Sequence, residues 1–235
     1  MKKILITGGK GSLASSINSD NYIILKPSKE EMDINNCNQL EKVIKSFKPD
    51  YFIHAAALTR PMVEHTKNPT KSITTNIIGT SNVVNVCIKY NIKLIYISTD
   101  YIYPGYTGNY TEEDPIYPVN EYAWSKLGGE CAVKLYKNSL ILRVATVDTP
   151  FPHNYALGDV YKSSISVEEV SEYVIRLLDE RGTINIGNER LLIYDYVYKT
   201  NPNIKKIFKS DIKDVKIAKD SSMSINKLKT IIKNG

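Results

Sequence analysis

Short apolar runs alternate with amphipathic segments over the first two thirds of the chain. The runs are nearly continuous in apolar residues, as in strands that are covered on both faces; they lie at 3–7, 22–25, 51–53, 93–98 and 140–144. The segments between them place apolar residues three and four positions apart, which predicts helices; they lie at 12–17, 36–47, 70–90 and 120–135. Strands that alternate with helices pair in parallel through right-handed crossovers. The pattern therefore predicts an α/β fold with a Rossmann-type doubly wound parallel sheet.

The pattern weakens after Val147. Residues 148–159 are expected to form a loop, followed by a helix at 167–178, a strand at 183–186 and a terminal helix at 224–232. We therefore expect a regular core over 1–147. A small C-terminal lobe with the remaining core elements is expected over 148–235.

Length and composition are those of an ordinary globular protein. The chain has 235 residues, of which 42% are hydrophobic and 24% charged, so its core needs no disulfide or metal. No apolar run approaches the roughly 20 residues of a transmembrane helix. The apolar run after Met1 is too short for a signal peptide and is expected to be a strand. These features predict a cytoplasmic protein without a membrane partner.

Charge and metal-ligand spacing narrow the function further. The net charge is +6, and the basic residues are spread along the chain with a mild excess over 205–219. Nucleic-acid binding needs a clustered basic face, so no nucleic-acid partner is expected. The three cysteines (Cys37, Cys87 and Cys131) share no metal or redox spacing, and the three histidines form no ligand pair. We expect no metal site, and we expect the cysteines to be buried in helices.

A glycine-rich turn follows the first predicted strand and opens the first predicted helix. Gly8 and Gly11 allow a tight turn and a close backbone approach to a pyrophosphate, and Ala14 allows the helix to pack on the sheet. The helix N-terminus, with Ser12 and Leu13, presents free N–H groups to the anion. The position between strand and helix predicts dinucleotide binding; the alternative is a structural turn.

The loop after the second strand indicates which dinucleotide is bound. A carboxylate that would bind an adenosine ribose 2′-hydroxyl belongs here, but no carboxylate occurs before Glu30. Lys26, Ser28 and Lys29 are instead suited to a 2′-phosphate. This favours NADP(H), with NAD(H) as the alternative; the three side chains would otherwise be solvated loop residues.

Tyr122 and Lys126 lie four residues apart in a predicted helix, so both face the same side. A cation near a phenol lowers the phenol pKa and favours proton transfer near neutrality. Thr99, at the end of a predicted strand, carries a hydroxyl. This hydroxyl is suited to bind the substrate carbonyl oxygen that Tyr122 would protonate. Together they predict a site that protonates a carbonyl.

These motifs, in this order, resemble the extended short-chain dehydrogenase/reductase superfamily over residues 1 to about 150. The resemblance implies that Thr99, Tyr122 and Lys126 are catalytic and that residues 1–147 form an NAD(P)-binding core. It also implies cofactor contacts beyond those named above, made by Asp33, Ile34, Ala55, Ala56, Ala57, Asn76, Tyr122 and Lys126. Helices at 70–90 and 119–137 commonly pair across a two-fold axis in that superfamily, so a homodimer is expected.

The segment from Ile97 to Glu130 is most similar to dTDP-4-dehydrorhamnose reductases and their relatives. That resemblance implies NADPH-dependent reduction of the C4 ketone of a nucleotide-linked 4-keto-6-deoxy sugar. Residues 148–235 would then bind a nucleotide-diphosphate sugar. The chain is shorter than is usual for that family, and the shortening falls in this lobe.

Substrate contacts are expected beyond the carboxyl ends of the strands. The candidates are Arg60, Asp100, Tyr101, Tyr103, Arg143 and His153. Arg143 is suited to a diphosphate but is also suited to a structural role. Lys162 and its neighbours are further candidates.

Two other functions stay open. One is a bifunctional 3- or 3,5-epimerase/4-reductase of a UDP- or dTDP-4-keto-6-deoxy sugar, for which His153 would be an acid or base. The other is a non-catalytic, cofactor-binding regulatory subunit like that of methionine adenosyltransferase. The complete Thr99–Tyr122–Lys126 set favours an active enzyme.

Overall fold

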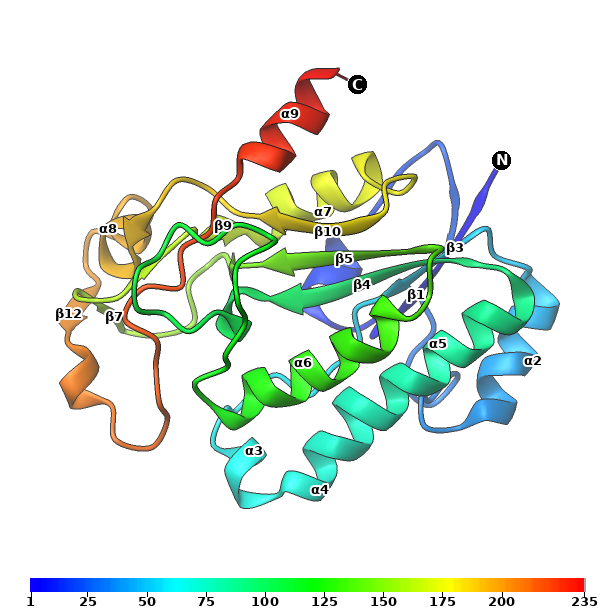
Figure 1. The fold of residues 1–235 in the computed structure, drawn as a ribbon, viewed down its shortest axis with the longest axis horizontal. Helices are drawn as coiled ribbons and strands as arrows, with labels where there is room; N and C mark the ends of the chain where they lie inside the picture. The colour runs from blue at the N-terminus through cyan, green and yellow to red at the C-terminus, as the bar shows by residue number, and fades with distance from the viewer. Residues whose placement is uncertain (235) are drawn as a thin grey trace.

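Six parallel strands form one sheet in the computed structural model, which describes residues 1–234 (Figure 1). The strand order is β10–β5–β4–β3–β1–β2. The strands are β1 (Lys3–Thr7), β2 (Ile23–Leu25), β3 (Tyr51–His54), β4 (Lys93–Thr99), β5 (Ser139–Val144) and β10 (Gly182–Ile186). The predicted Rossmann-type parallel sheet is confirmed.

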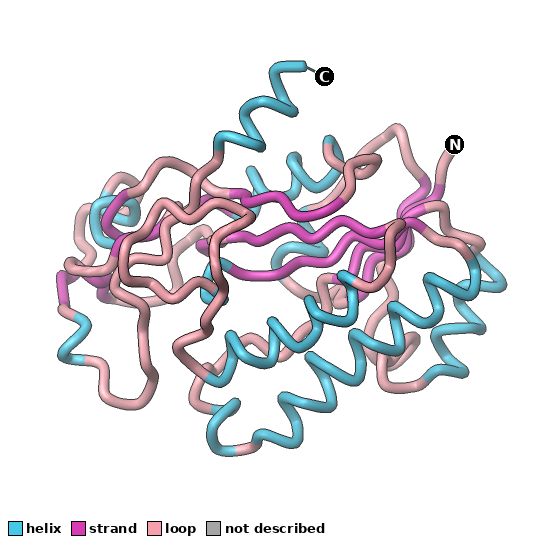
Figure 2. The backbone as a smooth tube through the Cα atoms, viewed as in Figure 1, coloured by secondary structure: helices cyan, strands magenta, loops and turns pink. Residues whose placement is uncertain are grey.

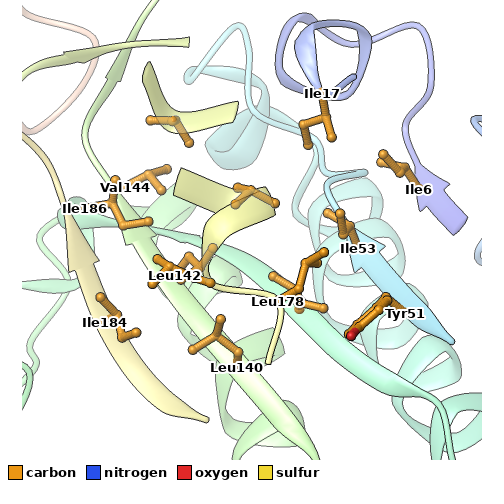
Figure 3. Packing of buried hydrophobic residues seen from close by; sticks show 14 of the residues in the cluster. Ile6, Ile17, Tyr51, Ile53, Leu140, Leu142, Val144, Leu178, Ile184 and Ile186 are labelled. Carbon is orange, nitrogen blue, oxygen red and sulfur yellow. The ribbon is translucent and has the colours of Figure 1, made fainter. Parts of the chain in front are cut away.

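Helices cover both faces of the sheet (Figure 2). One face carries α1 (Ser12–Ser16) and α7 (Val167–Arg176); the other carries α2 (Cys37–Phe47), α5 (Gly79–Tyr90) and α6 (Glu121–Lys134). Alternate strand residues enter the two cores, since Ile4 and Ile6 pack under α1 and α7 while Leu5 packs under α5. Figure 3 shows the first of these cores. Burial on both faces explains why the strands are apolar at nearly every position.

The direction of winding changes between β1 and β3. The chain passes from β1 outward to β2, and then from β3 through β4 and β5 to β10 on the other side. A crevice opens at the carboxyl ends of strands where the winding reverses, and ligands of doubly wound sheets bind there. The fold therefore places the ends of β1, β3 and β4 at the candidate site.

The helix predicted over 70–90 is present, with a π-helical segment within it. Short helices α3 (Glu64–Lys67) and α4 (Pro69–Ser72) lead into a π-helical segment, η1 (Ile73–Ile78), and α5 follows it. A wider π turn often occurs at functional positions. Here it turns Asn76 inward, where it is 1% exposed.

The C-terminal lobe is built from short strands that join distant segments. The pairs are β6 (Thr146–Val147) with β9 (Ile165–Ser166), β7 (Tyr155–Leu157) with β12 (Lys205–Ile207), and β8 (Tyr161–Lys162) with β11 (Leu191–Leu192). A small core of Ala156, Val197 and Ile204 lies under α8 (Ile193–Tyr198). The remaining elements are η2 (Asp100–Ile102), η3 (Lys209–Asp211) and α9 (Asn226–Asn234). The expected loop at 148–159 therefore contains β7, because strands this short leave little periodicity to detect.

The expectation that all three cysteines are buried is wrong for two of them. Cys87 is buried in α5, whereas Cys37 and Cys131 are exposed on their helices. No helix within residues 1–234 combines the length and apolarity needed to cross a bilayer.

Candidate active site

The glycine turn after β1 packs closely against two neighbouring loops. Gly8 has φ +73°, and a Cβ there would lie 3.0 Å from the Ala56 Cα. A Cβ on Gly9 would lie 2.4 Å from the carbonyl oxygen of Lys26. Gly11 precedes α1, whose N-terminus has no side-chain cap. The turn thus leaves the first backbone N–H groups of α1 without a side-chain acceptor, which fits a phosphate-binding role.

Thr7 and His54 hold the loop that faces this turn. The Thr7 hydroxyl accepts hydrogen bonds from the backbone N–H groups of Ala55 (3.2 Å) and Ala56 (3.1 Å). The Thr7 Oγ1 lies 2.8 Å from Nδ1 of His54, and the Thr80 Oγ1 lies 3.0 Å from its Nε2. Burial, together with the positive charge of Lys126, lowers the His54 pKa to about 3. His54 is therefore neutral and serves to fix the loop.

The candidate 2′-phosphate residues do not all face the same way. The Lys26 ammonium donates to the Ser15 carbonyl and the Asn18 side chain, so it is directed to α1 rather than to the loop. Lys29 remains exposed and lies 3.8 Å from the Asp33 carboxylate. Lys10, which the sequence analysis did not single out, lies 3.5 Å from Glu30. Lys10 and Lys29 are thus the more accessible cations here.

Ile34, another predicted cofactor contact, is 5% exposed. A Cβ on Gly79 would lie 2.6 Å from its Cδ1, so Ile34 packs closely against the start of α5. The Ser28 backbone N–H donates to the Glu31 carboxylate. These contacts order the loop between β2 and α2.

Thr99, Tyr122 and Lys126 come together where β4 ends beside α6. Thr99 is the last residue of β4, and its side chain accepts the Tyr101 N–H at 3.3 Å. Tyr122 lies in the first turn of α6, and its ring meets the Tyr101 ring edge-to-face with centroids 6.2 Å apart. The Lys126 ammonium is buried 4.2 Å from the centroid of the Tyr96 ring.

Burial dominates the charge state of this set. The Tyr122 pKa is raised to about 12 by desolvation, although the Thr99 hydroxyl and the Lys162 ammonium lower it. The expectation of a lowered phenol pKa is therefore wrong, because desolvation outweighs the effect of the Lys162 ammonium. The Lys126 pKa is lowered to about 7, also by desolvation, with Glu130 acting in the opposite direction. Tyr122 is protonated at neutral pH, as a proton donor must be.

Asn76 contacts residues next to the catalytic candidates, and His65 contacts the Tyr122 ring. The Asn76 amide accepts the Leu58 N–H at 2.8 Å and donates to the Leu58 carbonyl and to the Ser125 hydroxyl. The His65 ring meets the Tyr122 ring edge-on, with the two ring centroids 5.2 Å apart. The Nδ1 atom of His65 lies 2.7 Å from the Ser72 hydroxyl oxygen. Sequence analysis missed His65, since nothing local to it points to Tyr122. Asn76, predicted as a cofactor contact, has an amide already engaged by protein groups.

Arg143 and Tyr103 are not free to bind substrate, which corrects two predicted contacts. The Arg143 guanidinium is buried and lies 2.6 Å from the Glu130 carboxylate, whose other oxygen accepts from Ser98. Arg143 also donates to the Tyr103 hydroxyl at 2.8 Å, and that hydroxyl donates to Asn185. β5 lies between β4 and β10 in the sheet, so the guanidinium points into the protein.

The other predicted substrate contacts lie in different surroundings. Arg60 is exposed and forms an ion pair with Asp148. His153 lies on the surface of the lobe between Phe151 and Tyr155. Asp100 is 1% exposed and forms an ion pair with Lys162, while Tyr101 lies between Lys162 and Tyr122. Only Tyr101 and Asp100 therefore adjoin the Thr99–Tyr122–Lys126 set.

A groove of about 530 Å³ lies beside the first turn of α6, between the core and the lobe. We call it the lysine groove; its charged lining is Glu121, Lys209, Lys213, Asp214, Lys216 and Lys219. It is bounded on the core side by Pro104–Tyr106, which follow η2. Four lysines of the excess over 205–219 thus line a groove beside the first turn of α6, a position that composition alone did not reveal.

The fold and the candidate site define a member of the extended short-chain dehydrogenase/reductase superfamily. Within it, the chain belongs to the family whose model is described as RmlD substrate binding domain, which matches residues 1–158.

Two curated relatives illustrate the family's range. A dTDP-4-dehydrorhamnose reductase from Aggregatibacter actinomycetemcomitans is 32% identical over 162 residues, which are 66% of this chain and 55% of the relative. Methionine adenosyltransferase 2 subunit beta from Xenopus tropicalis is 29% identical over 206 residues, 82% of this chain and 58% of the relative. The chain spans about half the length of the curated relatives it matches.

A solved structure shares the fold over nearly the whole chain. It is a dTDP-4-dehydrorhamnose reductase from Bacillus anthracis in complex with NADP, with a TM-score of 0.87 and 24% identity. The match covers 98% of this chain and 93% of that one.

Proposed function

We propose that this protein reduces the C4 ketone of a nucleotide-linked 4-keto-6-deoxy sugar with NADPH. The observation that carries the proposal is the Thr99–Tyr122–Lys126 set at the carboxyl edge of the sheet, beside the glycine turn. The reductase from A. actinomycetemcomitans, matched over 66% of this chain, supports the choice of reaction.

The residues around the glycine turn fit NADP(H). Gly8 and Gly9 leave no room for a Cβ, and the start of α1 has no side-chain cap, which fits a pyrophosphate. Lys10 and Lys29 are the cations available to a 2′-phosphate. The NADP complex of the B. anthracis reductase supports this choice. NADPH, when bound, supplies the hydride.

The protein's own part in the reaction is to bind and protonate the ketone. Thr99 donates a hydrogen bond to the C4 oxygen, and the protonated Tyr122 phenol gives its proton to that oxygen. Lys126, buried one helical turn further on, binds the cofactor ribose and stabilises the phenolate that remains. In the lysine groove, Lys213 and Lys216 bind the substrate diphosphate.

Turnover of NADPH with a 4-keto-6-deoxy sugar nucleotide tests the proposal. Replacement of Tyr122 by Phe keeps the ring and removes the proton donor, so we expect kcat to fall by about 10² to 10⁴ while NADPH still binds. Tyr117→Phe, an exposed tyrosine, is the matched control and keeps the parental kcat. A Tyr122→Phe variant with unchanged kcat would show that the phenol is not the acid.

The same assay separates the two other functions. An epimerase/reductase incorporates solvent deuterium at C3 or at C3 and C5 of the product, whereas a simple reductase incorporates none there. A regulatory subunit binds NADPH without oxidising it. The match to the X. tropicalis protein, which covers 82% of this chain, supports this alternative. Binding without oxidation across UDP-, dTDP- and GDP-linked 4-keto sugars would therefore overturn the proposed reduction.

A further inference from the structure

A buried ion pair connects the C-terminal lobe to the turn that carries Thr99. The Lys162 ammonium, from β8, lies 3.0 Å from the Asp100 carboxylate, and both side chains are less than a tenth exposed. The Ser221 hydroxyl donates to the same carboxylate oxygen at 2.6 Å. Thr99 donates weakly to the other oxygen, at 3.3 Å, a hydrogen bond that it would exchange for one to the C4 oxygen in the proposed reaction. Protein groups thus occupy the Asp100 carboxylate on both oxygens.

Lys162 also contacts the second residue after Thr99. Its ammonium lies 3.9 Å from the centroid of the Tyr101 ring, close enough for a cation–π interaction. The Tyr101 ring in turn meets the Tyr122 ring edge-to-face. Lys162 therefore contacts both Asp100 and Tyr101, the two residues that follow Thr99.

The backbone around Lys162 is fixed from both sides. Lys162 pairs with Leu191 in the β8–β11 ladder, and the Tyr161 carbonyl accepts the Ser221 N–H at 3.2 Å. Arg190 stacks on the Tyr161 ring at 3.6 Å and donates to Asp220 at 2.7 Å. The ammonium is thus held by a rigid part of the lobe rather than by a free loop.

Stability alone does not explain this pair. Desolvating two charges costs about as much as their attraction returns, so a buried ion pair contributes little net stability compared with apolar residues of similar size. Its position, one residue from Thr99, suggests that it fixes geometry.

We propose that Lys162 is a positioning residue, which through Asp100 and Tyr101 holds the Thr99 turn against Tyr122. The inference rests on the proposed reduction. It assigns to the lobe a part in proton transfer, and it makes Asp100 a brace for Thr99 rather than a ligand of the sugar.

A double-mutant cycle tests whether Lys162 acts through Asp100. Lys162→Met and Asp100→Asn each remove one end of the pair, and we expect each to lower kcat on the order of 10- to 100-fold by misplacing Thr99. Because the two residues act as one unit, the kcat of the double variant is no lower than the kcat of the less active single variant. Losses that multiply in the double variant, or parental kcat in Lys162→Met, would overturn the proposal. Lys206→Met, which removes a lysine stacked on Tyr194 in the same lobe, is the control and keeps the parental kcat.

Titration of the Tyr122 phenol gives a readout that does not depend on turnover. The absorbance difference between the parent and Tyr122→Phe isolates this phenol from the other tyrosines. The groups that face it are Thr99, Asp100, Tyr101, Lys162, and His65 from α3. Lys162→Met removes a cation that lowers the Tyr122 pKa and leaves the Asp100 carboxylate that raises it, so the midpoint moves to higher pH. Lys162→Arg keeps the charge and leaves the midpoint unchanged.

The two readouts separate failure of this inference from failure of the proposed reduction. If the parent oxidises no NADPH with any 4-keto sugar nucleotide, the reduction fails, and the titration still decides whether Lys162 acts on Tyr122. An unmoved midpoint in Lys162→Met overturns the positioning role. If Lys162→Met does not fold, because Asp100 is left buried without a cation, the Lys162→Met/Asp100→Asn variant replaces it: its kcat must equal that of Asp100→Asn.

Discussion

At the scale of single residues, neighbours decide which charge each buried side chain carries. His54 is kept neutral between Thr7 and Thr80, because protonation would put a charge into a fully buried position beside Lys126. The Tyr122 phenol is kept protonated for the same reason. Desolvation thus prepares a neutral donor, while Lys162 and Thr99 limit how far its pKa rises.

His54 makes stability depend on pH. Its pKa is about 3 in the folded chain and near 6.5 in the unfolded chain, so between these values only the unfolded chain takes up the proton. The free energy of unfolding therefore falls as the pH falls through this window, by up to about 1.4 kcal/mol per pH unit from this group. Urea unfolding at several pH values in this window measures the dependence of the free energy of unfolding on pH. We expect this dependence to be shallower in His54→Gln than in the exposed-site control His153→Gln. Equal slopes would contradict the assignment.

Cofactor choice is also decided by single side chains. Lys29 is exposed next to Asp33, in the loop between β2 and α2. We expect NADPH to bind more tightly than NADH, and Lys29→Glu to narrow or reverse the difference, because the new carboxylate repels a 2′-phosphate. Fluorescence titration measures both affinities, with Lys42→Glu on the exposed face of α2 as the charge-matched control. Equal affinities for both cofactors in the parent and in Lys29→Glu would rule out this role.

Sequence reasoning predicted geometry correctly where that geometry depends on local spacing. The glycine turn and the Tyr122–Lys126 pair each lie within one short segment, so their geometry follows from the element that carries them. It failed where partners meet across the chain: nothing near Arg143 indicates that Glu130 will neutralise it. The pairing of Lys162 with Asp100 was equally invisible, since the lobe's short strands carry little pattern.

At the scale of elements, α6 is fixed to the sheet by a buried polar network. Glu130 on α6 binds Arg143 on β5 and accepts from Ser98 on β4, so the helix with Tyr122 is fixed in register with Thr99. The N-terminal end of the same helix is capped by Asn120, whose amide also donates to the Lys216 carbonyl. The helix that carries Tyr122 is thus attached to other elements through Asn120 and Glu130.

Breaking the Arg143–Glu130 pair should be costly. Arg143→Met leaves the Glu130 carboxylate buried without its cation, and we expect a loss of about 3–5 kcal/mol in the free energy of unfolding. The double variant Arg143→Met/Glu130→Leu removes both charges and should recover part of that loss. Urea unfolding followed by circular dichroism measures both. A loss below about 1 kcal/mol in the single variant would show that the pair is not a structural brace.

At the scale of the whole molecule, one side of the helical layer keeps large apolar residues in solvent. Ile78 on η1, Ile88 on α5 and Trp124 on α6 are each about half exposed, and Leu135 is 84% exposed. Other apolar residues of these helices, such as Val83 and Val133, pack inside. We propose that the exposed residues form an isologous contact with a second copy of the chain.

Sedimentation tests this dimer. At micromolar concentration the parent should sediment as a species of twice the 26.6 kDa chain mass. Ile78→Asp puts a charge into the apolar contact and should give monomers, whereas Phe208→Asp on the lobe, also half exposed, should not. A single parental species near the chain mass would reject the dimer.

The hydrogen bond from Ser221 to Asp100 joins residues 121 positions apart. During synthesis on a ribosome, the glycine turn and the α6 tyrosine emerge long before Ser221, and N-terminal segments fold first. A nascent chain can therefore assemble its nucleotide crevice while the brace on Thr99 is still missing. On the proposed function, acquisition of the cofactor and acquisition of catalytic competence become separate events in the life of the molecule, in that order.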